Sequence, residues 1–94
     1  MAIVMTMHWA GITKQDYAAI REETRFEKEA PVGGKYHVAW FQDDGLHVTD
    51  VWESGKHFEQ FVQTKLMPAA QKLGLKGEPK VVIHDAHNTF APNP

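Results

Sequence analysis

The chain has 94 residues, a net charge of −2 and no cysteine. This length suits a single domain, and the lack of cysteine excludes disulfides and thiolate metal sites. The ten lysines and arginines are scattered, which argues against a nucleic-acid-binding surface.

The sequence indicates a protein that works in the cytoplasm and associates with itself. No apolar run reaches the roughly 18 residues of a membrane span, and the first residues lack the pattern of a signal peptide. A chain of this size buries only about two thirds of its unfolded surface, so its stability is marginal. We therefore expect one domain over residues 1–94, with a tail at 88–94, that forms a homodimer.

The first segment, residues 2–9, predicts a half-buried strand because its residues alternate between an apolar and a mixed side. The apolar side holds Ile3, Met5, Met7 and Trp9, and the mixed side holds Val4, Thr6 and His8.

A capped helix and a hairpin are expected next. Thr13 and Asp16 have the spacing of a capping box. Residues 35–42 and 46–53 then predict two strands joined by Asp43-Asp44-Gly45, where Gly45 supplies the left-handed residue of a type I turn plus bulge. We expect Gln42 to face Leu46. That register would place Asp50 on one side of the sheet with Tyr36, Val38, Trp40, Val48 and Trp52.

The second helix carries the stronger apolar face. Ser54 is its expected cap and Gly74 its end, and Pro68 predicts a kink or restart near Leu66. Residues 80–87 predict the last strand. The apolar positions at helical spacing are Phe58, Phe61, Val62, Leu66, Ala69 and Leu73.

This order of elements is that of a split βαβ unit. Right-handed crossovers then predict an α+β fold with an antiparallel four-stranded sheet, in the order 4-1-3-2, and two helices on one face. The other face has no cover within the chain and carries large apolar side chains. We expect a second copy to cover it, giving a barrel-like dimer with a pocket between the sheet and the partner.

Three short segments resemble one known superfamily. They are MHWAG at residues 7–11, DVWES at 50–54 and HFEQF at 57–61. The chain resembles the dimeric α/β-barrel superfamily with its ferredoxin-like βαββαβ fold, and within it the small antibiotic-biosynthesis-monooxygenase-like proteins. The resemblance implies a homodimer. The family includes cofactor-free oxygenases, isomerases, cyclases, haem-degrading enzymes and members with no known reaction.

Asp50 and His8 are the candidate catalytic residues. A mid-strand carboxylate beside tryptophans would be desolvated, and such a group acts as a general base. A register that pairs His8 with Val48 would place Thr6 opposite Asp50 and join all three in one polar patch. A slip by one would set His8 against His47 on the helix side. We expect the first register. The alternative roles are a structural, hydrogen-bonded aspartate and a strand-end histidine.

The remaining candidates suit a flat aromatic ligand, such as a phenol or quinone. The expected substrate-binding residues are Thr6, Tyr36, Trp40, Trp52 and His84. His84 and His87 point to opposite sides of a strand, so they cannot chelate one ion together. A first-row metal would need ligands from separate strands or from both subunits, and we expect neither a metal nor another cofactor.

Two functions fit these features. The first is a small cofactor-independent enzyme, of monooxygenase, cyclase or isomerase type, acting on a flat phenolic or quinone-like molecule. The second is a non-catalytic ligand-binding or stress-related dimer with the same pocket. A metal- or haem-binding barrel is a third possibility. Fold alone does not separate them, because function depends on the site.

Overall fold

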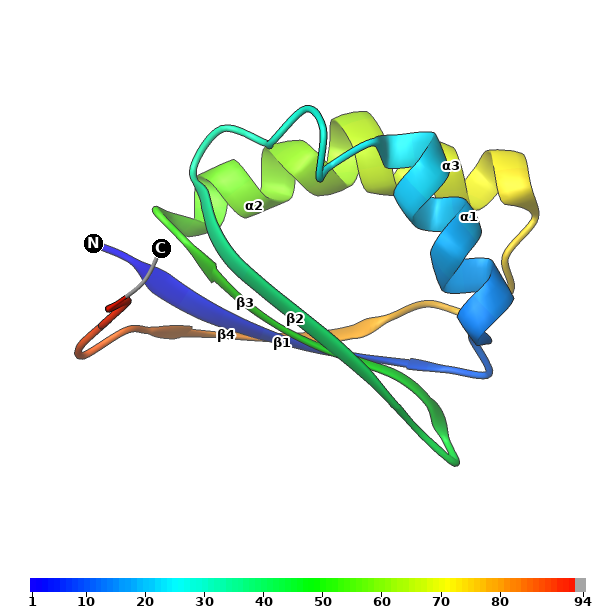
Figure 1. The fold of residues 1–94 in the computed structure, drawn as a ribbon, viewed down its shortest axis with the longest axis horizontal. Helices are drawn as coiled ribbons and strands as arrows, with labels where there is room; N and C mark the ends of the chain where they lie inside the picture. Colours follow the sequence, from blue (N-terminus) through cyan, green and yellow to red (C-terminus); the bar gives the residue numbers. More distant parts are fainter. Residues whose placement is uncertain (93–94) are drawn as a thin grey trace.

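A computed structural model describes residues 1–92, so positions 93 and 94 of the expected tail lie outside the described residues. The order strand, helix, two strands, helix, strand is that predicted (Figure 1). The elements are β1 (Ile3–Ala10), α1 (Lys14–Thr24), β2 (Gly34–Gln42), β3 (Gly45–Trp52), α2 (Gly55–Phe61), the π-helical turn η1 (Val62–Leu66), α3 (Met67–Leu73) and β4 (Lys80–Asp85).

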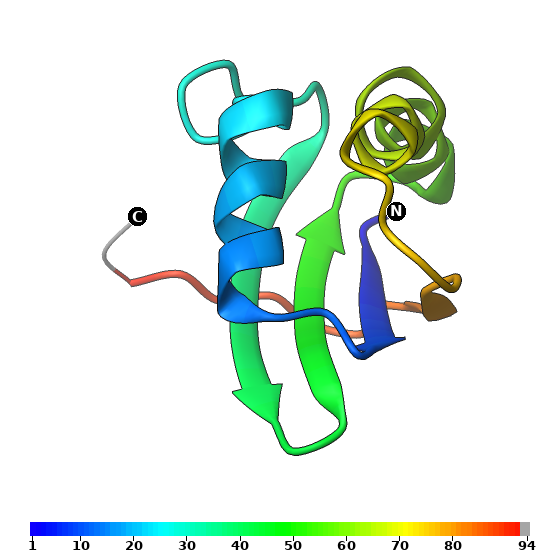
Figure 2. The same ribbon diagram turned by 90° about the vertical axis from the view of Figure 1, so that its right-hand side faces the viewer.

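The four strands form one antiparallel sheet in the order β2-β3-β1-β4. This is the predicted order, and the ferredoxin-like α+β fold is confirmed. All the helices lie on one face of the sheet. The helix α1 lies over the β2 side, and the run from α2 to α3 lies beside α1 on the same face (Figures 1 and 2). We call the opposite side of the sheet the open face. No helix of the described chain is long and apolar enough to cross a membrane.

The core lies between the sheet and the helices. The predicted alternation of β1 is confirmed, since its apolar side is buried and its mixed side lies on the open face. Because adjacent side chains of a strand point to opposite faces, one strand can serve both the core and the open face. The residues of the hydrophobic core are Ile3, Met5, Met7, Trp9, Ile12, Ile20, Leu46, Val48, Trp52, Phe58, Leu66 and Ala70.

Both helix starts are capped as the sequence predicts. The Thr13 hydroxyl accepts from the Asp16 amide, and the Asp16 carboxylate accepts from the Thr13 amide, each at 3.1 Å. The Ser54 hydroxyl accepts from the His57 amide at 3.2 Å. These caps fix the first turns of both helices, and Tyr17 lies one turn beyond the first cap.

The irregularity expected near Pro68 takes the form of the π turn η1. This turn ends at Leu66, and the Met67 amide donates to the Val62 carbonyl, five residues back. Proline has no amide hydrogen and its ring crowds the carbonyl four residues earlier, so a wider turn relieves the conflict. The helix thus runs from α2 through η1 into α3.

The chain turns at Asp43 and Asp44 as predicted, but the hairpin lacks the expected bulge there and has a different register. Gly45 has a positive φ of 122°, as expected. However, Gln42 pairs with Gly45 rather than Leu46, and His37 lies opposite Asp50. A shift of one residue moves every side chain of a strand to the other face. The expected grouping of Asp50 with Tyr36, Val38 and Trp40 is therefore wrong.

The register expected between the first and third strands is also wrong. His8 pairs with His47, and Met5 rather than Thr6 lies opposite Asp50. The pairing of His8 with His47 was the alternative, but it occurs on the open face and not on the helix side. Asp50 joins the buried side because the apolar residues that alternate with it, Leu46, Val48 and Trp52, need the helices as cover.

Candidate functional site

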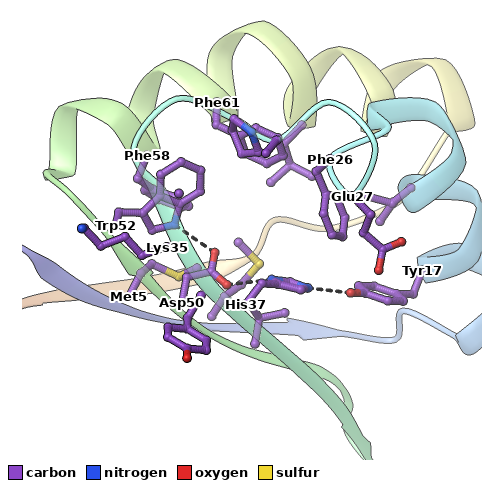
Figure 3. A pocket seen from close by; sticks show the side chains of 18 of the residues that line it. Met5, Tyr17, Phe26, Glu27, Lys35, His37, Asp50, Trp52, Phe58 and Phe61 are labelled. Carbon is purple, nitrogen blue, oxygen red and sulfur yellow. Dashed lines mark hydrogen bonds and ion pairs between the residues drawn. The ribbon is translucent and has the colours of Figure 1, made fainter. Parts of the chain in front are cut away.

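A cavity of about 320 Å³ lies between the sheet and the helices. Small-molecule sites start at about this size. The sequence predicts a pocket on the opposite side of the sheet, against a partner. The observed strand registers instead place Asp50 and Trp52 on the helix-facing side. Side chains from β1, α1, β2, β3, α2 and the loop before β2 converge on this cavity (Figure 3).

A chain of hydrogen bonds joins three elements within the cavity. The Tyr17 hydroxyl from α1 lies 2.6 Å from His37 Nε2 of β2. His37 Nδ1 lies 2.7 Å from Asp50 Oδ1 of β3. The indole of Trp52 donates to Asp50 Oδ2 at 3.0 Å. Figure 3 shows Tyr17, His37 and Asp50 in one row beneath the helices.

Asp50 is buried, with 6% of its surface exposed. A buried carboxylate is costly unless it is paired and hydrogen-bonded, and here both oxygens have partners. An ionised carboxylate only accepts hydrogen bonds, so His37 presents its Nδ1–H to Asp50. In the neutral imidazole, Nε2 is then free to accept the hydrogen of Tyr17. Asp50 is thus held by hydrogen bonds from two side chains, His37 and Trp52.

Tyr17 is held in its neutral form. Burial raises its pKa, the charges of Glu27 and Asp50 raise it further, and Arg21 opposes them. Arg21 is itself paired with Glu27 at 2.7 Å. Glu27 also lines the cavity, so an acidic group stands near the phenol.

Aromatic rings form the other walls of the cavity. Trp52 lies 5.6 Å from both Phe58 and Phe61, measured between ring centroids. Phe26 packs edge-on against His37 at 4.9 Å. Such walls favour a flat ligand, because aromatic rings pack well in offset or edge-to-face contact. The cavity is therefore mostly apolar, with one polar row along the sheet.

The predicted site residues divide between the two faces of the sheet. Asp50, Trp52 and Tyr36 line the cavity, although Tyr36 is also half exposed on the open face. The other four do not line it. His8, Thr6, Trp40 and His84 belong to the open face by register. The single site expected to contain both Asp50 and His8 is not formed.

The sequence analysis missed two residues of this hydrogen-bonded chain, His37 and Tyr17. His37 alternates with Ala39 and Phe41, and this side of β2 faces Asp50 once Gln42 pairs with Gly45. With the correct hairpin register, the sequence would have placed His37 opposite Asp50. No spacing signal in the sequence marks the hydroxyl of Tyr17.

One group of side chains in residues 1–92 has the composition and spacing of a metal site, and it lies outside the cavity. It consists of His8, Asp44 and His47 on the open face. A hydrogen bond from His47 and the proximity of His8 lower the pKa of Asp44.

Solved structures share this architecture. SnoaB, a cofactor-independent oxygenase from Streptomyces nogalater, aligns with a TM-score of 0.60 and 17% identity, covering 98% of this chain and 96% of that chain. The chain shares its fold with this oxygenase and with other solved structures described as antibiotic biosynthesis monooxygenases. The resemblance inferred from the three sequence segments is thereby confirmed as a likeness of fold.

Two further structures extend the likeness. A protein of unknown function from Nitrosomonas europaea has a TM-score of 0.68 and 13% identity, covering 99% of this chain and 95% of that chain. The third structure is a monooxygenase from the ActVA-Orf6 gene of Streptomyces coelicolor, in complex with Nanaomycin D. Its TM-score is 0.52 and its identity 17%, and the alignment covers 98% of this chain and 92% of that chain. No family model matches the sequence, and no curated protein matches it.

Proposed function

We propose that the protein is a cofactor-independent enzyme of the monooxygenase kind that removes a proton from a flat phenolic molecule bound in the cavity. The observation that carries this proposal is the row Tyr17–His37–Asp50. A phenol, a histidine and a buried carboxylate at 2.6 and 2.7 Å form a path along which a proton can move.

The three residues have distinct roles in this proposal. The substrate hydroxyl donates to the Tyr17 oxygen, which gives its own hydrogen to His37 Nε2 as it receives the substrate's proton. The resulting imidazolium is stabilised by the Asp50 carboxylate through Nδ1–H. Tyr17 begins and ends neutral, in keeping with its raised pKa. The substrate is left as an anion between aromatic walls.

The anion then reacts with dioxygen as co-substrate. In the enol form of a phenolic anthrone, loss of the hydroxyl proton makes the opposite ring carbon nucleophilic, and dioxygen adds at that carbon. The peroxide takes up the proton held by His37 and then leaves as water together with the remaining C–H hydrogen, so that the carbon becomes a carbonyl with one oxygen atom in the product and the other in water. The oxygenases that share the fold agree with this reaction class. Proton removal by a positioned base contributes typically about 100-fold or more to a rate.

Dioxygen uptake with dithranol, a phenolic anthrone, tests the proposal. Wild-type protein should consume one dioxygen per dithranol faster than buffer does. Asp50→Asn keeps the shape but loses the charge, and its turnover should fall about 100-fold. Asp85→Asn, at an exposed carboxylate of β4, is the matched control. Equal turnover of the two variants would contradict the role of Asp50, and no uptake above buffer would contradict the oxygenase.

We also propose that a second copy covers the open face. Tyr36, Val38 and Trp40 are 42–56% exposed there. Contiguous exposed apolar side chains usually mark a surface that contacts another protein. Val82 of β4 adds to this patch and is 49% exposed, whereas Val81 and Ile83 lie on the helix-facing side of that strand and are 38% and 41% exposed, so neither side of β4 is covered. A cytoplasmic location agrees with the absence of cysteine.

A further inference from the structure

Three side chains from separate segments meet at the hairpin end of the open face. His8 on β1 and His47 on β3 are direct partners across the two strands. Their rings stack at 4.5 Å with an angle of 17° between planes. Asp44 in the turn reaches both, with Oδ1 at 2.7 Å from His47 Nε2 and Oδ2 at 3.2 Å from His8 Nε2. Two imidazole nitrogens therefore point at one carboxylate.

The surroundings hold two of the three side chains in place. Strand pairing fixes the backbones of His8 and His47 opposite each other. Trp40 stacks on the other side of His47, at 5.4 Å and 19°. The side chains of His47 and His8 are 19% and 32% exposed, whereas that of Asp44 is 54% exposed. The cluster is thus partly preformed and still open to solvent through Asp44.

We propose that His8, His47 and Asp44 bind a divalent first-row transition metal ion such as Zn²⁺. Two neutral imidazoles and a carboxylate form a donor set typical of zinc and related ions. Their ligand atoms lie within 4.8 Å of one another. Donor atoms of one tetrahedral ion lie roughly 3–3.5 Å apart, so a small rotation of the exposed Asp44 and the two rings completes the site.

The ion would replace the hydrogen that His47 Nε2 donates to the Asp44 carboxylate and the one that His8 Nε2 donates to the Asp44 carbonyl. Three protein ligands leave at least one coordination position for water or another ligand. The ion would also join the β2–β3 turn to the end of β1, adding a cross-link to the hydrogen bond from the Gly11 amide to the Asp44 carbonyl. This site is separate from the cavity, because none of its three ligands lines the cavity.

Calorimetric titration with Zn²⁺ tests the site, using chelator-treated protein that carries no histidine tag. Wild-type protein should bind one ion per chain, and Zn²⁺ should raise its thermal midpoint. Asp44→Asn should weaken binding about 10-fold or more, since even residues behind the metal ligands have effects of that size. Asp43→Asn, at the neighbouring position of the same turn, should leave binding unchanged. Asparagine is well tolerated in turns, so both variants should fold.

A second pair of variants separates this site from the other histidines. His8→Ala should abolish the binding, whereas His84→Ala, on the exposed β4, should not. Co²⁺ provides an independent measurement, because its visible absorption should change on binding to wild type and not to His8→Ala. The proposal would be overturned by a wild type that binds no Zn²⁺, by equal binding in Asp44→Asn and Asp43→Asn, or by loss of binding in His84→Ala.

Discussion

Tyr17, in the hydrogen-bonded chain of the cavity, makes the stability of the protein depend on pH. Its pKa is raised in the folded protein, mainly by burial, whereas in the unfolded chain it is about 10. The folded state therefore holds this proton more tightly. The stability associated with it is fully present below pH 10 and is lost as the pH rises towards the folded-state pKa.

Tyr17→Phe should make the protein less sensitive to alkali. Phenylalanine cannot ionise, so between pH 9 and 11 (a range of about one unit either side of the unfolded pKa) the free energy of unfolding should fall less steeply than in wild type. Urea unfolding at several pH values measures this slope. The variant also lacks the hydrogen bond to His37, which lowers its stability at neutral pH by about 1 kcal/mol. Parallel curves for the two proteins would contradict a raised pKa at Tyr17.

At the scale of residues, sequence reasoning found the acid of the site but not its partners. Asp50 could be predicted because a mid-strand carboxylate among large apolar residues is unusual. His37 could not, because the two sides of β2 are equally apolar. Tyr36, Val38 and Trp40 on one side resemble Ala39 and Phe41 on the other, so hydrophobic pattern gave no preference for either register.

Among the elements, the β2–β3 hairpin depends most on one residue. Gly45 has a positive φ, and a Cβ atom there would lie 2.5 Å from the Trp9 carbonyl oxygen and 2.7 Å from the Gly11 nitrogen. A side chain would therefore be strained by its own backbone and would also push β1 away from the turn.

Gly45→Val should destabilise the protein by more than about 1 kcal/mol, since a β-branched residue resists positive φ. The midpoint of urea unfolding measures the loss. Gly55→Val is the matched control, because Gly55 has open space around it and no positive φ. Valine is also the better helix former, so the control should be neutral or slightly stabilising. An unchanged midpoint in Gly45→Val would show that the turn is not built in this way.

The elements themselves could be predicted because each has a local signal. The capping box, the Asp-Asp-Gly turn and the alternation of β1 all follow from residues close in sequence. The register between β1 and β3 could not be predicted in the same way, because it is fixed by how buried residues fill the space beneath the helices. The π turn shows the same limit, since proline predicts an irregularity but not its form.

At the scale of the whole molecule, the proposed dimer would account for the exposed apolar side chains of the open face. The domain is small, and its open face exposes aromatic and branched side chains. Association of two such faces would bury that surface and contribute roughly 25 cal/mol for each Å² of apolar area. A partner on the open face would also cover Val82 of the exposed β4.

Trp40→Glu should break the proposed dimer, because it places a charge in the middle of the apolar patch. Wild-type protein should sediment as a dimer at micromolar concentration, and the variant as a monomer or as aggregate with a lower thermal midpoint. Phe90→Glu is the control, since Phe90 is 82% exposed and follows β4. A stable wild-type monomer at that concentration would contradict the dimer.

The position of β1 inside the sheet has a consequence for the order in which the protein is made. β1 is synthesised first, yet its outer edge pairs only with β4, the last strand. The residues that form the hydrogen-bonded chain of the cavity, Tyr17, His37, Asp50 and Trp52, are all made before α2 and β4. Until β4 arrives, however, β1 presents an unpaired edge beside a row of large apolar side chains, which is where a growing chain is most open to pairing with the wrong strand.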